Sequence, residues 1–167
     1  MAGEFDLIRD YFQGATATRA DVALGIGDDC ALLSVPPGRQ LAVSMDTLVC
    51  GRHFLPDVDP ESLGHKALAV NLSDLAAMGA EPAWVTLGLT LPGADAHWQG
   101  WLGAFVRGFA GLAAQHGVQL VGGDTTRGEL SITVQVHGFV QPGQALRRDG
   151  AREGDLVYVS GQLGDAG

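Results

Sequence analysis

The sequence is short of positive charge and of long apolar runs. Its 167 residues include 10 Lys and Arg against 19 Asp and Glu, which gives a formal net charge of -9. A protein that binds the phosphate backbone of nucleic acid needs clustered Lys and Arg, so this charge argues against a nucleic-acid partner. The longest apolar stretches are interrupted by Gly, Asn or Asp, and no membrane span is therefore expected.

Cysteine is scarce as well. Cys30 and Cys50 form neither a disulfide framework nor a metal-ligand spacing, so reduced thiols in the cytoplasm are expected. The first residues include Glu4 and Asp6 and no apolar stretch of the secretory kind, so no signal peptide is expected. The sequence also lacks a P-loop, a GxGxxG, HExxH or GxSxG motif and paired CxxC motifs. The common nucleotide, zinc and serine-hydrolase classes therefore have no support from motifs.

What the sequence does contain is acidic residues in unusual places. Gly25-Ile26-Gly27-Asp28-Asp29-Cys30-Ala31 places two adjacent carboxylates between apolar segments. An exposed acidic turn explains such a pair, and so does Mg²⁺, which takes oxygen ligands and links carboxylates to substrate phosphates. The pattern recurs at Asp46, Asp74 and Asp124, each at the end of or inside an apolar segment. Pattern alone leaves turns or caps and a metal site about equally supported, because Asp also favours turns and caps.

Apolar content of 46% and charged content of 17% indicate a globular domain with a core. Hydrophobic periodicity and turn residues predict an α+β fold. Helices are predicted over 4–12, 60–78 and 96–116, the second with Asp59 as N-cap and Gly79 after its end. Strands are predicted over 22–24, 31–33, 41–49, 84–91, 118–121, 130–140 and 156–160. This order predicts a mixed, largely antiparallel sheet with helices on one face.

Two of these elements carry polar residues that bear on function. Alternation along 41–49 places Ser44 and Asp46 on one face and Met45 on the other. The helix over 60–78 is apolar nearly all round and is expected to be buried. A buried Asp74 then needs a metal ion or an Arg as compensation. On pattern alone, His53 is a surface or turn histidine and Arg148 a solvated charge.

Five segments resemble one known family. They are GIGDDCALL at 25–33, SMDTLV at 44–49, HFLPDVDP at 53–60, KALAVNLSDLAAMGAEP at 66–82 and VGGDTTRG at 121–128. They look like thiamine-monophosphate kinase, a branch of the ATP-binding superfamily that includes aminoimidazole ribonucleotide synthetase and selenophosphate synthetase. The resemblance covers nearly the whole chain. It implies transfer of the γ-phosphoryl group of ATP to thiamine monophosphate, which yields thiamine diphosphate.

The resemblance also implies site residues and cofactors. Mg²⁺ and ATP are the expected cofactor and co-substrate. The implied metal ligands are Asp29, Ser44, Met45, Asp46, Asp74 and Asp124, with Asp28 adjacent; the implied nucleotide contacts are Gly123, Asp124 and Arg148; the implied substrate contact is His53. These carboxylates are expected to converge on one cleft. No residue is assigned as a general base, because a phosphate acceptor is already largely a dianion at neutral pH.

The sequence departs from the family in three respects. Met45 stands where the family commonly has Thr, so a metal bond there would have to use the backbone carbonyl. Val106 stands near the position where many relatives place a nucleotide-binding Tyr. The family also continues into a second domain, so residues 1–150 are expected to form an N-terminal ATP-, Mg²⁺-binding and dimerisation domain, and 151–167 the start of a C-terminal one. Relatives join two sheets into a dimeric β-barrel, which would cover the open sheet face.

Two alternatives stay open at this stage. The first is another ATP-dependent enzyme of the same superfamily, with a different phosphate acceptor. The second is a non-catalytic nucleotide- or metal-binding dimerisation module, since a single domain of this kind is expected to turn over negligibly by itself.

Overall fold

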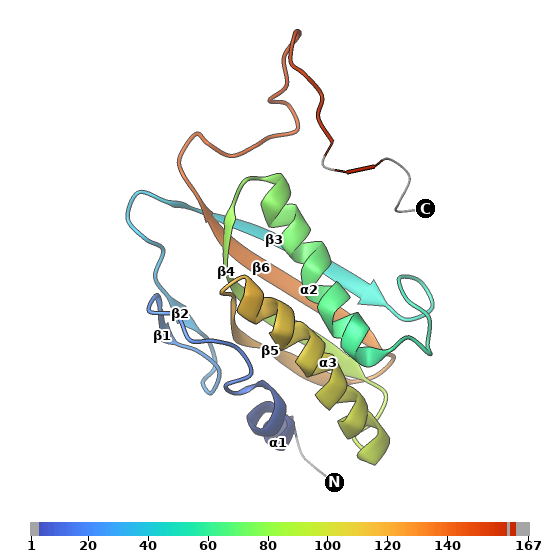
Figure 1. The fold of residues 1–167 in the computed structure, drawn as a ribbon. Helices are drawn as coiled ribbons and strands as arrows, with labels where there is room; N and C mark the ends of the chain where they lie inside the picture. The colour runs from blue at the N-terminus through green and yellow to red at the C-terminus, as the bar shows by residue number, and fades with distance from the viewer. Residues whose placement is uncertain (1–3, 160, 163–167) are drawn as a thin grey trace.

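The computed structural model describes residues 4–159, 161 and 162, and it is built around one four-stranded sheet (Figure 1). The strands are β3 (Gln40–Val49), β4 (Glu81–Leu91), β5 (Gln119–Arg127) and β6 (Ser131–Val140), in the order β3-β6-β4-β5. β6 is antiparallel to both β3 and β4, whereas β4 and β5 are parallel. The predicted α+β fold with a mixed, largely antiparallel sheet is confirmed.

Two long helices lie side by side on one face of this sheet (Figure 1). α2 (Pro60–Ala77) begins where Asp59 Oδ2 accepts a 2.7 Å hydrogen bond from the Ser62 amide, and α3 (Ala96–Gln115) begins where Asp95 caps two amides. Gly79, with φ +67°, follows the end of α2. The predicted ends at 78 and 116 differ from the observed ones by one residue. Local capping chemistry is sufficient to fix these boundaries. None of the helices that the structure describes has the length and hydropathy to cross a bilayer.

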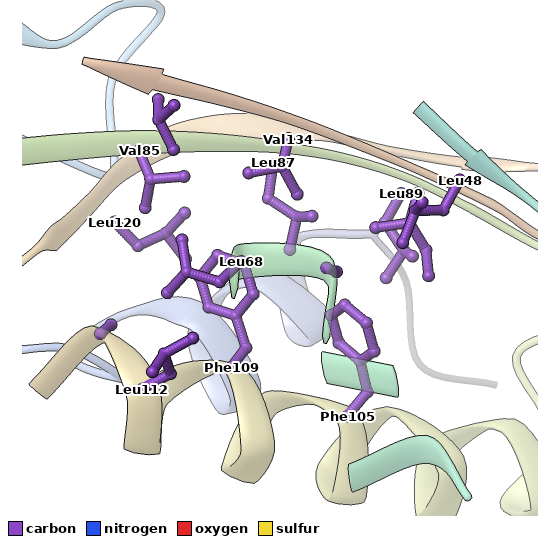
Figure 2. Packing of buried hydrophobic residues seen from close by; sticks show 14 of the residues in the cluster. Leu48, Leu68, Val85, Leu87, Leu89, Phe105, Phe109, Leu112, Leu120 and Val134 are labelled. Carbon is purple, nitrogen blue, oxygen red and sulfur yellow. The ribbon is translucent and has the colours of Figure 1, made fainter. Parts of the chain in front are cut away.

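The core lies between the helices and the sheet (Figure 2). Leu68 of α2 and Phe105 of α3 have no exposed surface, and they face strand residues such as Val85 and Leu87. Burial of this apolar layer is the main favourable term for the fold, at about 25 cal/mol per Å² removed from water.

The two helices approach each other so closely that their backbones touch. A Cβ atom built at Gly64 would lie 2.0 Å from the carbonyl oxygen of Phe105, and one at Gly108 would lie 1.8 Å from that of Glu61. Neither distance is compatible with a side chain, so glycine is required at both positions. The crossing brings α2 down onto the sheet beside α3, which places the polar residues of α2 next to β3.

Shorter elements precede the sheet. α1 (Glu4–Leu7) continues as the π-helical turn η1 (Ile8–Phe12), and β1 (Val22–Leu24) pairs antiparallel with β2 (Leu32–Leu33). The strand predicted over 156–160 is wrong for its described part, because 156–159 have no strand partner and are exposed, while residue 160 lies outside the described residues. A strand needs a neighbour to satisfy its backbone, and the described chain offers none there.

The second face of the sheet is partly open. Near one end, residues of the β1–β2 hairpin pack against Trp84, Val121 and Phe139. Along β3, Leu41, Val43 and Met45 are 43%, 50% and 60% exposed. His137 of β6 lies opposite Val43 in the ladder, and burial lowers the pKa of its imidazole. This face carries apolar surface that the described chain does not cover.

Candidate functional site

A cavity of about 550 Å³ is lined by the acidic loop, which we define as residues Gly25–Ala31, and by the middle of β5. Asp28, Asp29 and Asp124 contribute carboxylates to its wall, while Ile8 and Phe12 contribute apolar surface. All three carboxylates are exposed. We call them the loop–β5 group. A cavity with carboxylates at its wall and an apolar side suits a ligand that carries both charged and flat apolar parts.

Glycine lets β5 approach β4 at this cavity. Gly123 has φ +155°, and a Cβ there would lie 2.0 Å from the carbonyl oxygen of Leu87 on β4. The neighbouring Gly122 has open space where its Cβ would be. The β4–β5 ladder shifts register between Val85 and Thr86, just before Gly123 pairs with Leu87. A side chain at position 123 would push β5 away from β4. The position of Asp124 in the cavity wall therefore depends on glycine at 123.

A second group of polar residues lies where α2 crosses β3. The hydroxyl of Ser44 donates a 2.7 Å hydrogen bond to Asp74 Oδ2. The amide of Asp46 donates to Asn71 Oδ1 at 3.1 Å, and Asn71 Nδ2 donates to the carbonyl of Ala67 at 2.9 Å. Ser44, Asp46 and Asp74 form what we call the β3–α2 group. Asn71, 1% exposed, ties its two elements together.

α2 is buried on one face only, so the predicted burial of the whole helix, and of Asp74 within it, is wrong. Leu63, Leu68 and Leu75 are buried on the side of α2 that faces the core, but Asp74 is exposed. The helix looks apolar all round because small residues such as Ala76 and Ala77 occupy its outer face, and these residues are exposed. An exposed carboxylate needs no buried partner, and the hydroxyl of Ser44 is sufficient to orient it.

The expected convergence of the five carboxylates on one cleft is not found in a single copy. β3 and β5 are opposite edges of the sheet, with β6 and β4 between them. At about 4.8 Å per strand spacing, the two edges are roughly 14 Å apart. Across the described ranges, no set of three or more His, Cys, Asp or Glu is close enough to hold a metal ion. The structure thus holds two separate polar groups, the loop–β5 group and the β3–α2 group, which we call half-sites in the proposal below.

The remaining predicted residues lie outside both groups. Met45 is 60% exposed, on the face of β3 opposite Ser44 as alternation predicts. Arg148 is exposed in the segment after β6. His53 lies in the loop after β3, where its Nδ1 accepts a 3.0 Å hydrogen bond from the amide of Val49. The ammonium of Lys66 donates to the carbonyl of His53 at 2.8 Å.

Sequence reasoning missed the residues that hold the site together. The spacing of Asn71 and Asp74, three positions apart, does place them on one face of the helix, but it does not reveal that Asn71 binds the backbone of β3. No sequence pattern indicated the role of Lys66, because its partner is the backbone carbonyl of His53, which any residue type would provide. Arg19 and Asp21 carry no motif, yet they form an ion pair, and Arg19 also donates to the carbonyl of Gly117, 98 positions along the chain.

Comparisons with known proteins agree on one family. The curated thiamine-monophosphate kinase of Escherichia coli (strain K12) is 58% identical over 164 residues, which are 98% of this chain and 50% of that protein. The chain therefore spans about half the length of the curated relatives it matches.

Solved structures of thiamine-monophosphate kinases also resemble the chain. The crystal structure of thiamine-monophosphate kinase from Stenotrophomonas maltophilia K279a is 53% identical and superposes with a TM-score of 0.78, over 87% of this chain and 45% of that one. AaThiL complexed with AMPPCP and TMP is 31% identical with a TM-score of 0.65, over 90% of this chain and 45% of that one. Residues 27–140 match the model of the AIR synthase related protein, N-terminal domain. Because that match covers more than half of the chain, the chain belongs to the AIR synthase related protein family, of which it carries the N-terminal domain.

Proposed function

We propose that this chain is the N-terminal half of a kinase that transfers the γ-phosphoryl group of ATP to thiamine monophosphate and forms thiamine diphosphate. The relatives that match it over 98% of its length are thiamine-monophosphate kinases, and one structural neighbour holds an ATP analogue together with TMP. The observation that carries the proposal is the cavity whose wall combines the loop–β5 carboxylates with side-chain-free backbone at Gly122 and Gly123. We place the reaction in the cytoplasm, since the free thiols of Cys30 and Cys50 suit a reducing compartment.

The residues present fit Mg²⁺. The donors at both half-sites are carboxylate and hydroxyl oxygens, which hard cations prefer. In the proposed enzyme Asp29 and Asp124 hold Mg²⁺ at the cavity, and Ser44, Asp46 and Asp74 hold it at the β3–α2 group, with Met45 contributing through its carbonyl. When bound, Mg²⁺ neutralises the phosphate charges that otherwise keep two polyanions apart. The backbone around Gly123 lets a phosphate chain lie close to β5. Arg148 lies outside this cavity, and its role as a nucleotide contact is what the family resemblance implies for the assembled enzyme.

No general base is needed for this transfer. The acceptor phosphate has a second pKa near 6, so it is mostly a dianion at neutral pH and can attack directly. The protein's task is to position the two substrates. His53 is suited to orient the acceptor: because its Nδ1 accepts from the Val49 amide, the neutral ring carries its proton on Nε2, free to donate to an anionic oxygen. We therefore propose direct in-line transfer without a phosphoenzyme, because an acceptor dianion needs no activation by the protein.

We propose that a second copy of the chain brings the two half-sites together. Two four-stranded sheets can close into a barrel if β3 of one copy joins β5 of the other, since these are the outer strands of each sheet. That joint would place the β3–α2 group of one copy beside the loop–β5 group of its partner. It would also cover Leu41, Val43 and Met45. On this proposal, the separation of the two acidic groups among the described residues of one copy is a consequence of how the site is assembled.

The homodimer is expected to be visible in solution. Sedimentation of the 167-residue chain at micromolar concentration should give a dimer, and Val43→Asp should give a monomer, because a carboxylate would be buried at the joint. The matched control is Val35→Asp, since Val35 is 41% exposed but lies outside the sheet. A native chain that sediments as a monomer would contradict the proposed barrel.

The metal and nucleotide site is tested by titration calorimetry with Mg²⁺ and AMPPCP. The native chain is expected to bind weakly, and Asp124→Asn and Asp74→Asn are each expected to weaken binding at least about tenfold, or 1.4 kcal/mol. Asp57→Asn serves as the control, since Asp57 is exposed and lies outside both groups. If all four proteins bind alike, the acidity is a surface property and the proposed site is wrong.

Two alternatives predict different results. Another ATP-dependent enzyme of the superfamily would bind AMPPCP equally well but would prefer a different acceptor, so turnover of the full-length enzyme with a panel of phosphate acceptors distinguishes it. A non-catalytic binding module would show binding without phosphoryl transfer even in the full-length protein. The identities of the matching relatives favour thiamine monophosphate over both.

A further inference from the structure

A network of side-chain hydrogen bonds fastens the chain that leads into the acidic loop to the start of β5. The amide of Leu120 donates to Thr16 Oγ1 at 2.8 Å. The amide of Arg19 donates to Gln119 Oε1 at 2.6 Å, and its guanidinium donates to the carbonyl of Gly117 at 2.8 Å. The partners are about a hundred residues apart in sequence, so this contact forms only when β5 is in place.

The side chain of Arg19 forms an ion pair with Asp21, and Asp21 accepts a hydrogen bond from a side chain of β4. Arg19 Nε and Nη2 donate to the two oxygens of Asp21 at 3.0 Å and 2.8 Å, and the side chains are 24% and 19% exposed. The indole Nε1 of Trp84 donates to Asp21 Oδ1 at 3.0 Å. Trp84 lies on β4 and is 1% exposed. The Asp21 carboxylate thus links the guanidinium to a buried side chain of the central sheet.

The ionisation of the pair agrees with this geometry. Hydrogen bonding from Arg19 lowers the pKa of Asp21, with a further contribution from Trp84, and the same bond raises the pKa of Arg19. Because the pKa of folded Asp21 lies below its unfolded value of 3.8, its stabilising contribution is complete above that pH and is lost as the pH falls through the lowered pKa. At neutral pH the ion pair is fully formed.

The acidic loop itself has few attachments. Its ends are the short strands β1 and β2, and the amide of Ser34 donates to the carbonyl of Asp21 at 2.8 Å, which closes the hairpin at the same residue. Within the loop, the Asp29 amide donates to Asp28 Oδ1 at 2.8 Å. A Cβ at Gly25 would lie 3.6 Å from Gln119 Nε2, so the side chain that binds Arg19 also borders the loop.

We propose that the Arg19–Asp21–Trp84 network positions the acidic loop against β5, so that Arg19 and Asp21 are positioning residues for the cation and nucleotide held by Asp29 and Asp124. This inference rests on the proposed function. The network fixes the hairpin at its base to both β4 and β5, the strands that carry the other wall of the cavity. Without it, the loop keeps its carboxylates but not their place relative to Asp124. The sheet core between β3, β6 and β4 does not depend on the network.

The test compares Asp21→Asn with Asp149→Asn. Asn keeps an acceptor for the Trp84 indole but removes the charged pair, while Asp149 forms an exposed 2.8 Å ion pair with Arg147 far from the loop. Mn²⁺ with AMPPCP is the probe, followed by water-proton relaxation at saturating metal. Asp21→Asn is expected to weaken Mn²⁺ binding at least tenfold and to raise the relaxation enhancement, because a displaced loop leaves more waters on the ion. A purely structural role would not change the enhancement at saturation.

Hydrogen exchange gives a readout that does not depend on the metal. In Asp21→Asn the amides of residues 26–31 are expected to exchange at least tenfold faster, while those of β4 and β6 exchange at native rates. Asp149→Asn should leave both sets unchanged.

The outcomes separate this inference from the proposed function. If Asp124→Asn abolishes Mn²⁺ binding but Asp21→Asn binds with native affinity and native relaxation enhancement, the positioning role is wrong and the site stands. If the native chain binds no Mn²⁺, the proposed site is wrong in this chain and the positioning role for it is overturned too. Whatever the Mn²⁺ result, if the loop amides of Asp21→Asn exchange at native rates, the network does not position the loop and the inference is wrong.

Discussion

Gly108→Ala is expected to lower the free energy of unfolding by about 3 kcal/mol, at the upper end of the cost of overpacking. The added methyl would lie 1.8 Å from the carbonyl oxygen of Glu61 and 2.7 Å from its carbonyl carbon. Because these are backbone atoms of α2, no rotamer change can relieve the clash, and the two helices must separate. Total stabilities of domains this size are about 5–15 kcal/mol, so the loss is a large fraction.

The matched control lies one turn further along the same helix. A Cβ at Gly111 would have no atom within 4 Å. Gly111→Ala should therefore be neutral or raise stability by up to about 1 kcal/mol, the difference in helix propensity between the two residues. Urea denaturation followed by circular dichroism measures both variants. Equal stability of Gly108→Ala and Gly111→Ala would show that the helices are not in backbone contact.

Gly123→Ala is expected to have a comparable effect on stability and a larger one on the site. Its methyl would lie 2.0 Å from the carbonyl oxygen of Leu87 and 2.9 Å from the amide nitrogen of the same residue. β5 would have to move away from β4, which should cost about 3 kcal/mol. Since Asp124 follows directly, binding of Mg²⁺ and AMPPCP should fall more than tenfold in the fraction that remains folded.

Gly122→Ala is the control for stability, because a Cβ at that position meets nothing within 4 Å. It should unfold within about 0.5 kcal/mol of the native chain, as for most substitutions without a packing conflict. Both variants are compared by urea denaturation, and binding by Gly123→Ala is measured at low temperature, where the folded fraction is highest. A Gly123→Ala variant as stable as Gly122→Ala would mean that β4 and β5 are further apart than the structure places them.

The parts of the fold that follow from short stretches of sequence could be predicted. Asp59 and Gly79 mark the ends of α2, and alternation along β3 separates Met45 from Ser44 and Asp46. These features depend on residues within a few positions of each other. The order of the strands in the sheet cannot be predicted from short stretches of sequence. That order places Asp46 and Asp124 on opposite edges of the sheet.

The errors have the same origin. Residues 156–159 have the composition of a strand but no strand beside them among the described residues. Asp74 is exposed because no further layer of the described chain covers α2, and the composition of the helix does not predict whether such a layer exists. The Arg19–Asp21–Trp84 network joins segments 63 positions apart, so no local pattern could have revealed it. The candidate site residues could be named from the family resemblance, but their division into two half-sites required the structure.

The long free edge of β3 has a practical consequence for anyone who purifies this chain. Its ten residues contain neither Pro nor Lys and a single charge, Asp46, so the edge lacks the features that usually block strand-to-strand aggregation. Mutual repulsion from a net charge of -9 is then the main protection of the unassembled protein in solution. Buffers near the isoelectric point of about 4.7 remove that repulsion and invite precipitation, whereas mildly alkaline, low-salt storage preserves it.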